Sequence, residues 1–197
     1  MVIRQVVNTV FNSCSYVLTQ DGASWIVDCG DVDLLLPLID GRLKGVMITH
    51  SHFDHIYGLN HLQSLFPGVP VLTNEAGREG LLSDKLNFSR YHETPFIFDT
   101  PEVIRIVEDG ELVNLFGDID VQAIYTPGHS PCSVTWEVGK KALFTGDSYI
   151  PGLKTVTNFP HSDKWQAQLS REYILQLAEN DIVYPGHPSH VEEEYEL

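Results

Sequence analysis

The chain has 197 residues, 43% of them hydrophobic and 20% charged, which is typical of one globular domain with a core of its own. We therefore expect residues 1–197 to form a single domain. The formal net charge is −15 and the 12 lysines and arginines are scattered, which argues against nucleic acid or an anionic membrane as a partner. No signal-peptide pattern is present, and the richest apolar run, at residues 34–39, is too short to cross a bilayer, so a cytoplasmic location is expected.

The first half of the chain is predicted to alternate between strands and short helices. The strands span residues 2–10, 15–19, 23–28, 45–49 and 69–73, and the helices span residues 32–39, 56–66 and 74–82. Asn74 is the expected N-cap of the last of these helices. Residues 86–98 have no regular pattern, which is typical of a long surface loop.

The second half is predicted to contain mostly strands, followed by one helix and a final strand. The strands span residues 102–107, 111–115, 119–125, 133–138, 141–144 and 182–184. Ser162 is expected to cap the helix, whose apolar residues recur every four positions and predict one buried face: Trp165, Leu169, Tyr173 and Leu177. This order of elements favours an α/β fold in which two sheets pack together and are flanked by helices.

One short motif, His50-Ser51-His52-Phe53-Asp54-His55, is rich in metal-binding side chains. It directly follows an apolar strand, where the chain leaves the sheet and can present side chains to a cleft. Imidazole nitrogens and a carboxylate in this density are ligands suited to zinc, iron or manganese. The motif therefore predicts a metal centre at the end of this strand.

Three other strand ends each deliver one further residue of a ligand type. His129 follows Thr126-Pro127-Gly128, Asp147 follows Gly146, and His187 follows Pro185-Gly186. Proline or glycine ends the strand ladder at these places, and glycine leaves room beside the chain. We expect all three side chains to converge with the first motif on one rim of the sheets.

In this set of motifs the chain resembles the metallo-β-lactamase superfamily, and within it the type II glyoxalase-like (hydroxyacylglutathione hydrolase-like) branch. The resemblance covers nearly the whole chain and includes Asn12-Ser13-Cys14-Ser15-Tyr16, Asp28-Cys29-Gly30 and Thr73-Asn74-Glu75 as well as the ligand motifs. It implies the four-layer αββα sandwich of that fold, with two mixed sheets. The chain is expected to lack the C-terminal helical domain of full-length glyoxalases of this type.

The resemblance also implies a ligand set and a mechanism. His50, His52 and His129 would hold one divalent ion, Asp54, His55 and His187 a second, and Asp147 would bridge both. Zinc is favoured, and iron or manganese also suits these ligands. A hydroxide shared by two ions would attack a carbonyl, and Asp54 would orient it as a catalytic residue.

One element of the glyoxalase-like branch is missing: residues 150–157 contain no Gly-Arg-[Ser/Thr]-Asp sequence after Asp147. Other residues are therefore candidates for contacting the substrate. They are Arg90, Tyr149, Lys154 and Lys164.

The leading functional hypothesis is a dinuclear hydrolase of a small thioester or ester. A lactonase and a mononuclear iron oxygenase similar to the persulfide dioxygenases of the superfamily are the alternatives, and a non-catalytic metal-binding module is a third class. Metal stoichiometry separates the hydrolase from the oxygenase. The expected partner is a small-molecule substrate, and the oligomeric state stays open.

Overall fold

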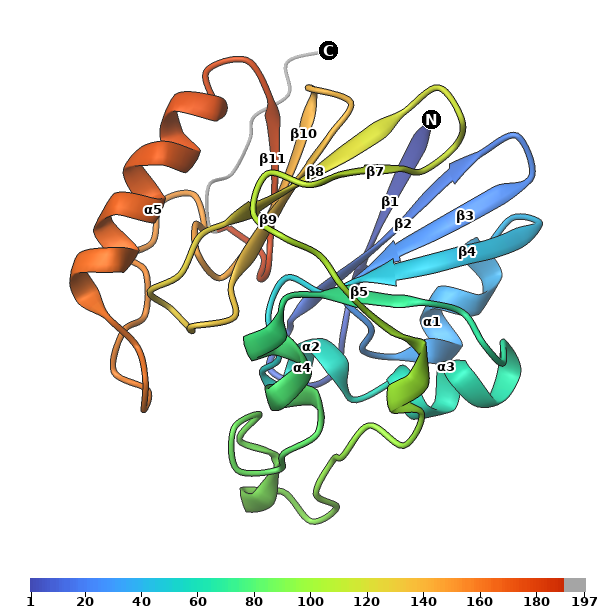
Figure 1. The fold of residues 1–197 in the computed structure, drawn as a ribbon, viewed down its shortest axis with the longest axis horizontal. Coiled ribbons are helices and arrows are strands. Elements are labelled where there is room, and N and C mark those ends of the chain that lie inside the picture. The colour runs from blue at the N-terminus through green and yellow to red at the C-terminus, as the bar shows by residue number, and fades with distance from the viewer. Residues whose placement is uncertain (190–197) are drawn as a thin grey trace.

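Two β-sheets form the centre of the computed structural model, which describes residues 1–189 (Figure 1). The first sheet has the order β1 (Val2–Val7), β2 (Cys14–Gln20), β3 (Ala23–Val27), β4 (Arg42–Met47), β5 (Val71–Thr73), β6 (Ile104–Ile106). The second has the order β11 (Ile182–Pro185), β10 (Ala142–Gly146), β9 (Val134–Val138), β8 (Asp120–Tyr125), β7 (Leu112–Asn114). Both contain parallel and antiparallel pairs, so the prediction of two mixed sheets is confirmed.

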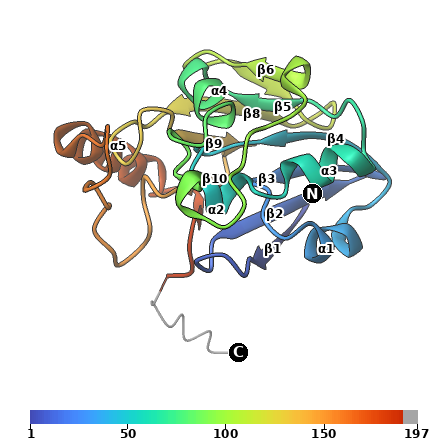
Figure 2. The ribbon, with the colours of Figure 1, turned by 90° about the horizontal axis from the view of Figure 1, so that it is seen from below.

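Helices flank the two sheets on opposite sides. They are α1 (Val32–Leu35), α2 (Phe53–Ile56), α3 (Leu59–Leu65), α4 (Glu75–Leu81) and α5 (Lys164–Leu177), with short 3₁₀ segments η1 (Leu36–Leu38), η2 (Ser89–Tyr91) and η3 (Pro101–Val103). Apolar residues of α1, α2 and α3 pack on the first sheet, whereas α5 lies beside the second sheet, far from α1 (Figures 1 and 2). The four-layer αββα arrangement is therefore the observed fold.

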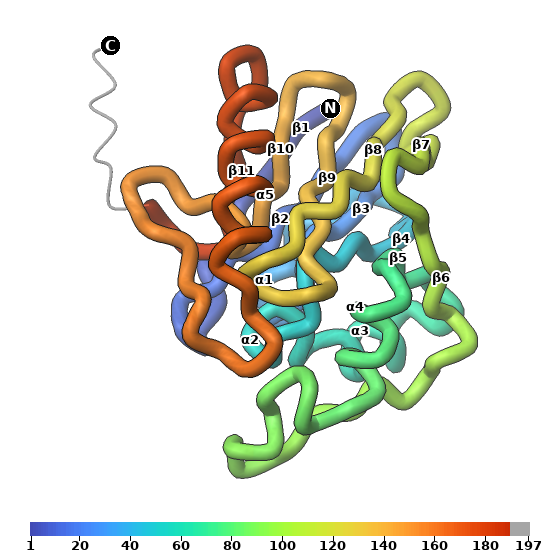
Figure 3. The backbone as a smooth tube through the Cα atoms, turned by 60° about the vertical axis from the view of Figure 1, so that its left-hand side comes forward, coloured from blue at the N-terminus to red at the C-terminus, as the bar shows by residue number. Residues whose placement is uncertain are grey.

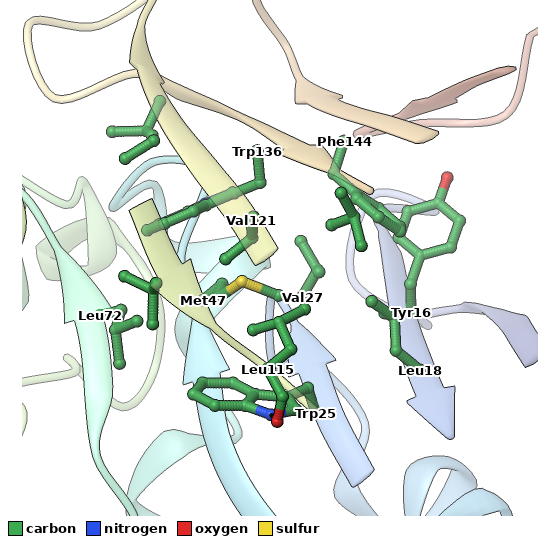
Figure 4. Packing of buried hydrophobic residues seen from close by; sticks show 14 of the residues in the cluster. Tyr16, Leu18, Trp25, Val27, Met47, Leu72, Leu115, Val121, Trp136 and Phe144 are labelled. Carbon is green, nitrogen blue, oxygen red and sulfur yellow. Dashed lines mark hydrogen bonds between the residues drawn. The ribbon is translucent and has the colours of Figure 1, made fainter. Parts of the chain in front are cut away.

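One core cluster lies between the sheets and a second lies between the first sheet and its helices, because side chains alternate along each strand. On β2, Tyr16 and Leu18 face the second sheet, and Val17 between them packs with the helices on the other side. Trp136 and Phe144 from the second sheet meet this first set (Figure 4). β2, β3 and β5 in the middle of the first sheet are consequently buried on both faces, whereas the edge strand β1 is largely exposed.

Several predicted boundaries shift where the chain approaches the metal motif. The first strand ends at Val7 rather than residue 10, because residues 8–13 form a turn in which Phe11 and Asn12 adopt positive φ. The helix predicted over residues 56–66 is two helices, and α2 already begins at Phe53. Gly58 separates them, and its backbone N–H donates to the Cys29 carbonyl. The motif therefore spans the junction between a strand and a helix.

The predicted cap of α5 is wrong by one residue. The Asp163 carboxylate accepts from the N–H groups of Trp165 and Gln166 at 2.8 and 2.9 Å, as an N-cap does. Ser162 instead donates its hydroxyl to the carbonyl of His129 at 2.7 Å. Its role is thus to hold the loop that carries a candidate ligand.

The predicted buried face of α5 is also wrong. Trp165 is 67% exposed, and Leu169 and Tyr173 are likewise exposed, whereas Ala167 and Ile174 are buried. α5 crosses the chain at Gly128, where a Cβ would collide with Ala167. Such a close approach needs small residues, and it therefore overrides the four-residue apolar repeat.

Among the described residues, no helix is long and apolar enough to span a bilayer.

Candidate metal centre

The structure brings all seven predicted ligands to one end of the two sheets. The first motif leaves β4 and enters α2, with His52 in extended conformation at the helix N-cap and Asp54 in the first turn. His129 follows β8, Asp147 follows β10 and His187 follows β11. Since these strand ends lie side by side, residues far apart in sequence share one site.

The candidate ligands form two clusters, each with ligand atoms within 4.8 Å of one another, and a third such group, His50, His55 and Asp147, links them. His50, His52 and His129 form the first cluster, and Asp54, His55 and His187 form the second. These are the two sets that the resemblance implied. In the second cluster, the Asp54 carboxylate lies 3.4 Å from Nε2 of both imidazoles.

Asp147 lies between the two clusters. Its Oδ2 is 3.5 Å from His129 Nε2 and 3.4 Å from His187 Nε2, and its Oδ1 is 3.6 Å from His55 Nε2. One carboxylate therefore reaches a histidine of each cluster. This is the position that a residue bridging two ions requires.

The donor atoms themselves indicate that the site fits metal ions. Within the described part of the chain, His50 Nε2, His55 Nε2 and Asp147 Oδ1 are buried without a hydrogen-bond partner. Buried polar atoms are rarely left unsatisfied unless something binds them. His52 Nδ1 and His129 Nε2 also face each other at 3.0 Å. A cation that accepts both lone pairs satisfies this arrangement.

Electrostatics favours neutral imidazoles in the first cluster. Burial lowers the pKa of His50 well below its usual value, and burial together with His129 lowers the pKa of His52 to about 3. Burial also lowers the pKa of His129. These rings consequently carry free lone pairs at neutral pH, the form that binds metal.

The second cluster is held by opposite charges. Burial alone would lower the pKa of His55, but Asp54 and Asp28 raise it to about 10. Burial would raise the pKa of Asp147, but the imidazoles of His187, His55 and His129 hold that pKa well below its usual range. Without a cation, the carboxylates therefore keep protons on neighbouring imidazoles. Divalent ions would displace those protons on binding.

Asp28, at the end of β3, positions two of the histidines. Its side chain is buried and accepts from His55 Nδ1 at 2.9 Å and from the N–H and hydroxyl of Thr49, both at 2.7 Å. The Thr49 hydroxyl lies 3.1 Å from His50 Nδ1. A protonated Nδ1 leaves Nε2 of each ring free toward the metal centre. The sequence pattern Asp28-Cys29-Gly30 supported the resemblance, but nothing in it identified this role.

Replacing Asp28 with asparagine is expected to weaken metal binding about 10- to 100-fold. The amide must present its oxygen to the Thr49 N–H, so its NH₂ group would face His55 and favour the ring form with the proton on Nε2. A competition titration with a chromogenic chelator measures the change. Asp31→Asn is the matched control, because Asp31 accepts from Thr9 and Tyr57 but contacts no candidate ligand. Equal affinities for the two variants would contradict this role.

Backbone contacts hold two further histidines. His129 Nδ1 lies 2.9 Å from the Val156 carbonyl, and His187 Nδ1 lies 3.2 Å from the Phe11 carbonyl. Gly186 permits the Asp147 carboxylate to lie beside β11, since a Cβ at this residue would collide with it. The glycine in Pro185-Gly186-His187 therefore leaves the space that Asp147 of the Gly146-Asp147 sequence occupies.

A cleft of about 380 Å³ opens over the candidate ligands. The four residues predicted to contact substrate do not line it. Arg90 pairs with Asp84 at 2.8 Å, the Tyr149 ring lies under the Arg171 guanidinium, and Lys154 and Lys164 are exposed to solvent. Loops 82–98 and 147–163 instead contribute Phe88 and Phe159. The sequence indicated that the loop at residues 86–98 could form one wall of the cleft, but it assigned no role to either phenylalanine, because their positions depend on loop geometry.

Residues 8–187 match the family model of the metallo-beta-lactamase superfamily. Together with the fold and the clustered His and Asp side chains, this match shows that the chain belongs to that superfamily.

Individual relatives and solved structures show what the chain is similar to within the superfamily. The hydroxyacylglutathione hydrolase GloC of Haemophilus influenzae is 29% identical over 192 residues, covering 90% of this chain and 86% of the relative. Glyoxylase B2 of Dictyostelium discoideum is 27% identical over 80% of this chain, which spans only 54% of that relative. Among solved structures, BLEG-1, a B3 metallo-beta-lactamase, superposes with a TM-score of 0.86 at 27% identity, covering 95% of this chain and 92% of its own.

Proposed function

We propose that this protein is a dinuclear metal-dependent hydrolase that cleaves a small thioester or ester. The observation that carries the proposal is the position of Asp147, which reaches histidines of both ligand clusters. An open cleft above these clusters supports a catalytic site, because structural metal sites have a closed ligand shell. The GloC relative, named a hydroxyacylglutathione hydrolase, supports the reaction type.

His50, His52 and His129 would hold one ion, and Asp54, His55 and His187 the other, with Asp147 between them. When bound, two divalent ions supply hydroxide at neutral pH and polarise a carbonyl oxygen. Zinc is the proposed metal, and iron or manganese suits the same ligands.

The chain itself would orient the reactants. Asp54 has its carboxylate at the floor of the cleft and would accept a hydrogen bond from the attacking water as the catalytic residue. Oxygen then bonds to the carbonyl carbon, the carbon–sulfur or carbon–oxygen bond breaks, and the thiol or alcohol leaves with a proton. A substrate that lies against the aromatic walls of the cleft would displace water from the reacting carbonyl.

Metal removal tests this function. Protein purified without added metal is expected to contain about two ions per chain by plasma mass spectrometry. Dialysis against a chelator should abolish hydrolysis of a thioester and ester panel and lower the Tm, because bound ions stabilise only the folded state. Added Zn²⁺ should restore both. About one iron per chain, with oxygen consumption on persulfides and no ester hydrolysis, would overturn the proposal in favour of an oxygenase.

A further inference from the structure

Beyond the candidate ligands, the cleft over the metal centre is lined mostly by apolar side chains, with Asn87 and His92 as the polar exceptions. Its walls carry Phe11, Phe53, Phe88, Leu153, Val156 and Phe159. Among the described residues, no lysine, arginine or glutamate lines it, and its only carboxylates are Asp54 and Asp147 at the floor. Asn87 already donates to the carbonyls of Gly80 and Phe96, and the His92 ring packs against the Phe53 ring with centroids 4.3 Å apart. No lysine or arginine in these walls would pair with an anionic group on a substrate.

Two phenylalanines from different loops form one continuous wall. Phe88 and Phe159 stack with ring centroids 5.4 Å apart, and their rings lie 5.0 and 5.2 Å from the His52 ring. The two loops, green and orange in Figure 3, lie at the same end of the molecule. An aromatic surface therefore starts directly beside a candidate ligand.

The wall at Phe88 is preformed at a conformational cost. Phe88 has φ +64°, in the left-handed region that non-glycine residues rarely adopt. The buried Asn87 side chain holds this backbone, donating to the carbonyls of Gly80 and Phe96 and accepting from the Ser89 N–H. Such strain is retained mainly at functional sites. The Phe88 ring is thus placed in the cleft before any substrate arrives.

The rim of the cleft also exposes apolar side chains to water. Phe11 is 66% exposed, Val156 47% and Phe159 41%, and Leu153 is exposed beside them. Single exposed apolar residues are ordinary, but a contiguous set around a reactive centre marks a binding surface. A ligand that covers this rim removes its apolar surface from water, and the free energy of that burial would favour binding.

We propose that this cleft selects an uncharged substrate: a thioester or ester whose apolar group lies against Phe88 and Phe159. The identity of the scissile bond rests on the proposed function, whereas the preference for an apolar, neutral ligand rests on the walls alone. A glutathione conjugate would bring two carboxylates to a surface that no lysine or arginine lines, and burying an unpaired carboxylate is costly.

The direct test measures binding of two thioethers that cannot be hydrolysed. S-hexyl-N-acetylcysteamine and S-hexylglutathione carry the same chain, and only the second carries carboxylates. By calorimetry on the metal-loaded protein, the neutral ligand is expected to bind at least about tenfold more tightly. Equal or tighter binding of S-hexylglutathione would overturn the proposal.

A charge placed in the wall tests the location. Leu153→Lys is expected to shift the preference toward S-hexylglutathione by about tenfold, because it supplies the missing cation. Leu65→Lys is the matched control, since Leu65 is similarly exposed on α3 and does not line the cleft. An equal shift in both variants would show that overall charge, not the cleft, sets the preference.

Hydrolysis of the matching thioesters separates this inference from the proposed function. Preferred turnover of S-hexanoyl-N-acetylcysteamine over S-hexanoylglutathione supports both. Tight binding of the neutral thioether without hydrolysis of any ester would reject the hydrolase and keep the inference. Preferred turnover of S-hexanoylglutathione would keep the hydrolase and reject the inference.

Discussion

Replacing Asp147 with asparagine is expected to reduce the metal content from about two ions to one or fewer per chain and hydrolysis by about 1,000-fold or more. The carboxylate is the residue that reaches both ligand clusters, and the imidazoles around it hold its pKa well below its usual range. An amide of the same shape keeps the packing beside Gly186 but removes the charge that offsets two cations. Metal analysis and hydrolysis of the best thioester are measured on the same preparation.

Asp33→Asn is the matched control, because Asp33 is exposed in the first turn of α1. It removes the same charge without touching the centre and should leave metal content and rate unchanged. If the Asp147 variant kept both ions and full activity, the proposed bridging role would be wrong. Loss of metal with an unchanged rate would instead separate the reaction from the metal centre.

Replacing Trp136 with alanine is expected to lower the free energy of unfolding by about 3–5 kcal/mol. Trp136 is fully buried between the sheets (Figure 4), and its indole N–H donates to the Ile48 carbonyl at 3.1 Å. The alanine variant leaves a cavity and an unsatisfied carbonyl next to the strand end that carries His50. Urea unfolding of the metal-free proteins measures the change without a contribution from bound ions.

Trp165→Ala provides the control with the same change in side-chain size. Trp165 is 67% exposed on α5, so its removal should alter the free energy of unfolding by no more than about 0.5 kcal/mol. Similar losses in the two variants would mean that Trp165 is buried in solution, as its four-residue spacing had predicted. Trp136→Phe should lie between them, because it keeps most of the packing and loses the hydrogen bond.

The sequence by itself determined the fold class and the identity of the candidate ligands. A ligand such as His50 or His187 is recognisable because it follows a strand directly, and a strand end is a local feature that residue pattern and proline or glycine reveal. The continuous apolar run at residues 45–49 likewise predicted a buried strand directly before the metal motif, since a strand covered on both faces carries few polar residues.

Only the tertiary structure decided the supports and the walls of the site. Asp28 and Thr49 act on His55 and His50 across strand pairings, and Phe88 meets Phe159 only because two distant loops converge. The face that α5 buries was decided by its close contact with Gly128, not by its own apolar repeat. The residue pattern within a segment indicates which side chains that segment can bury or use as ligands. Which other segment it contacts depends on packing between parts of the chain that are far apart in sequence.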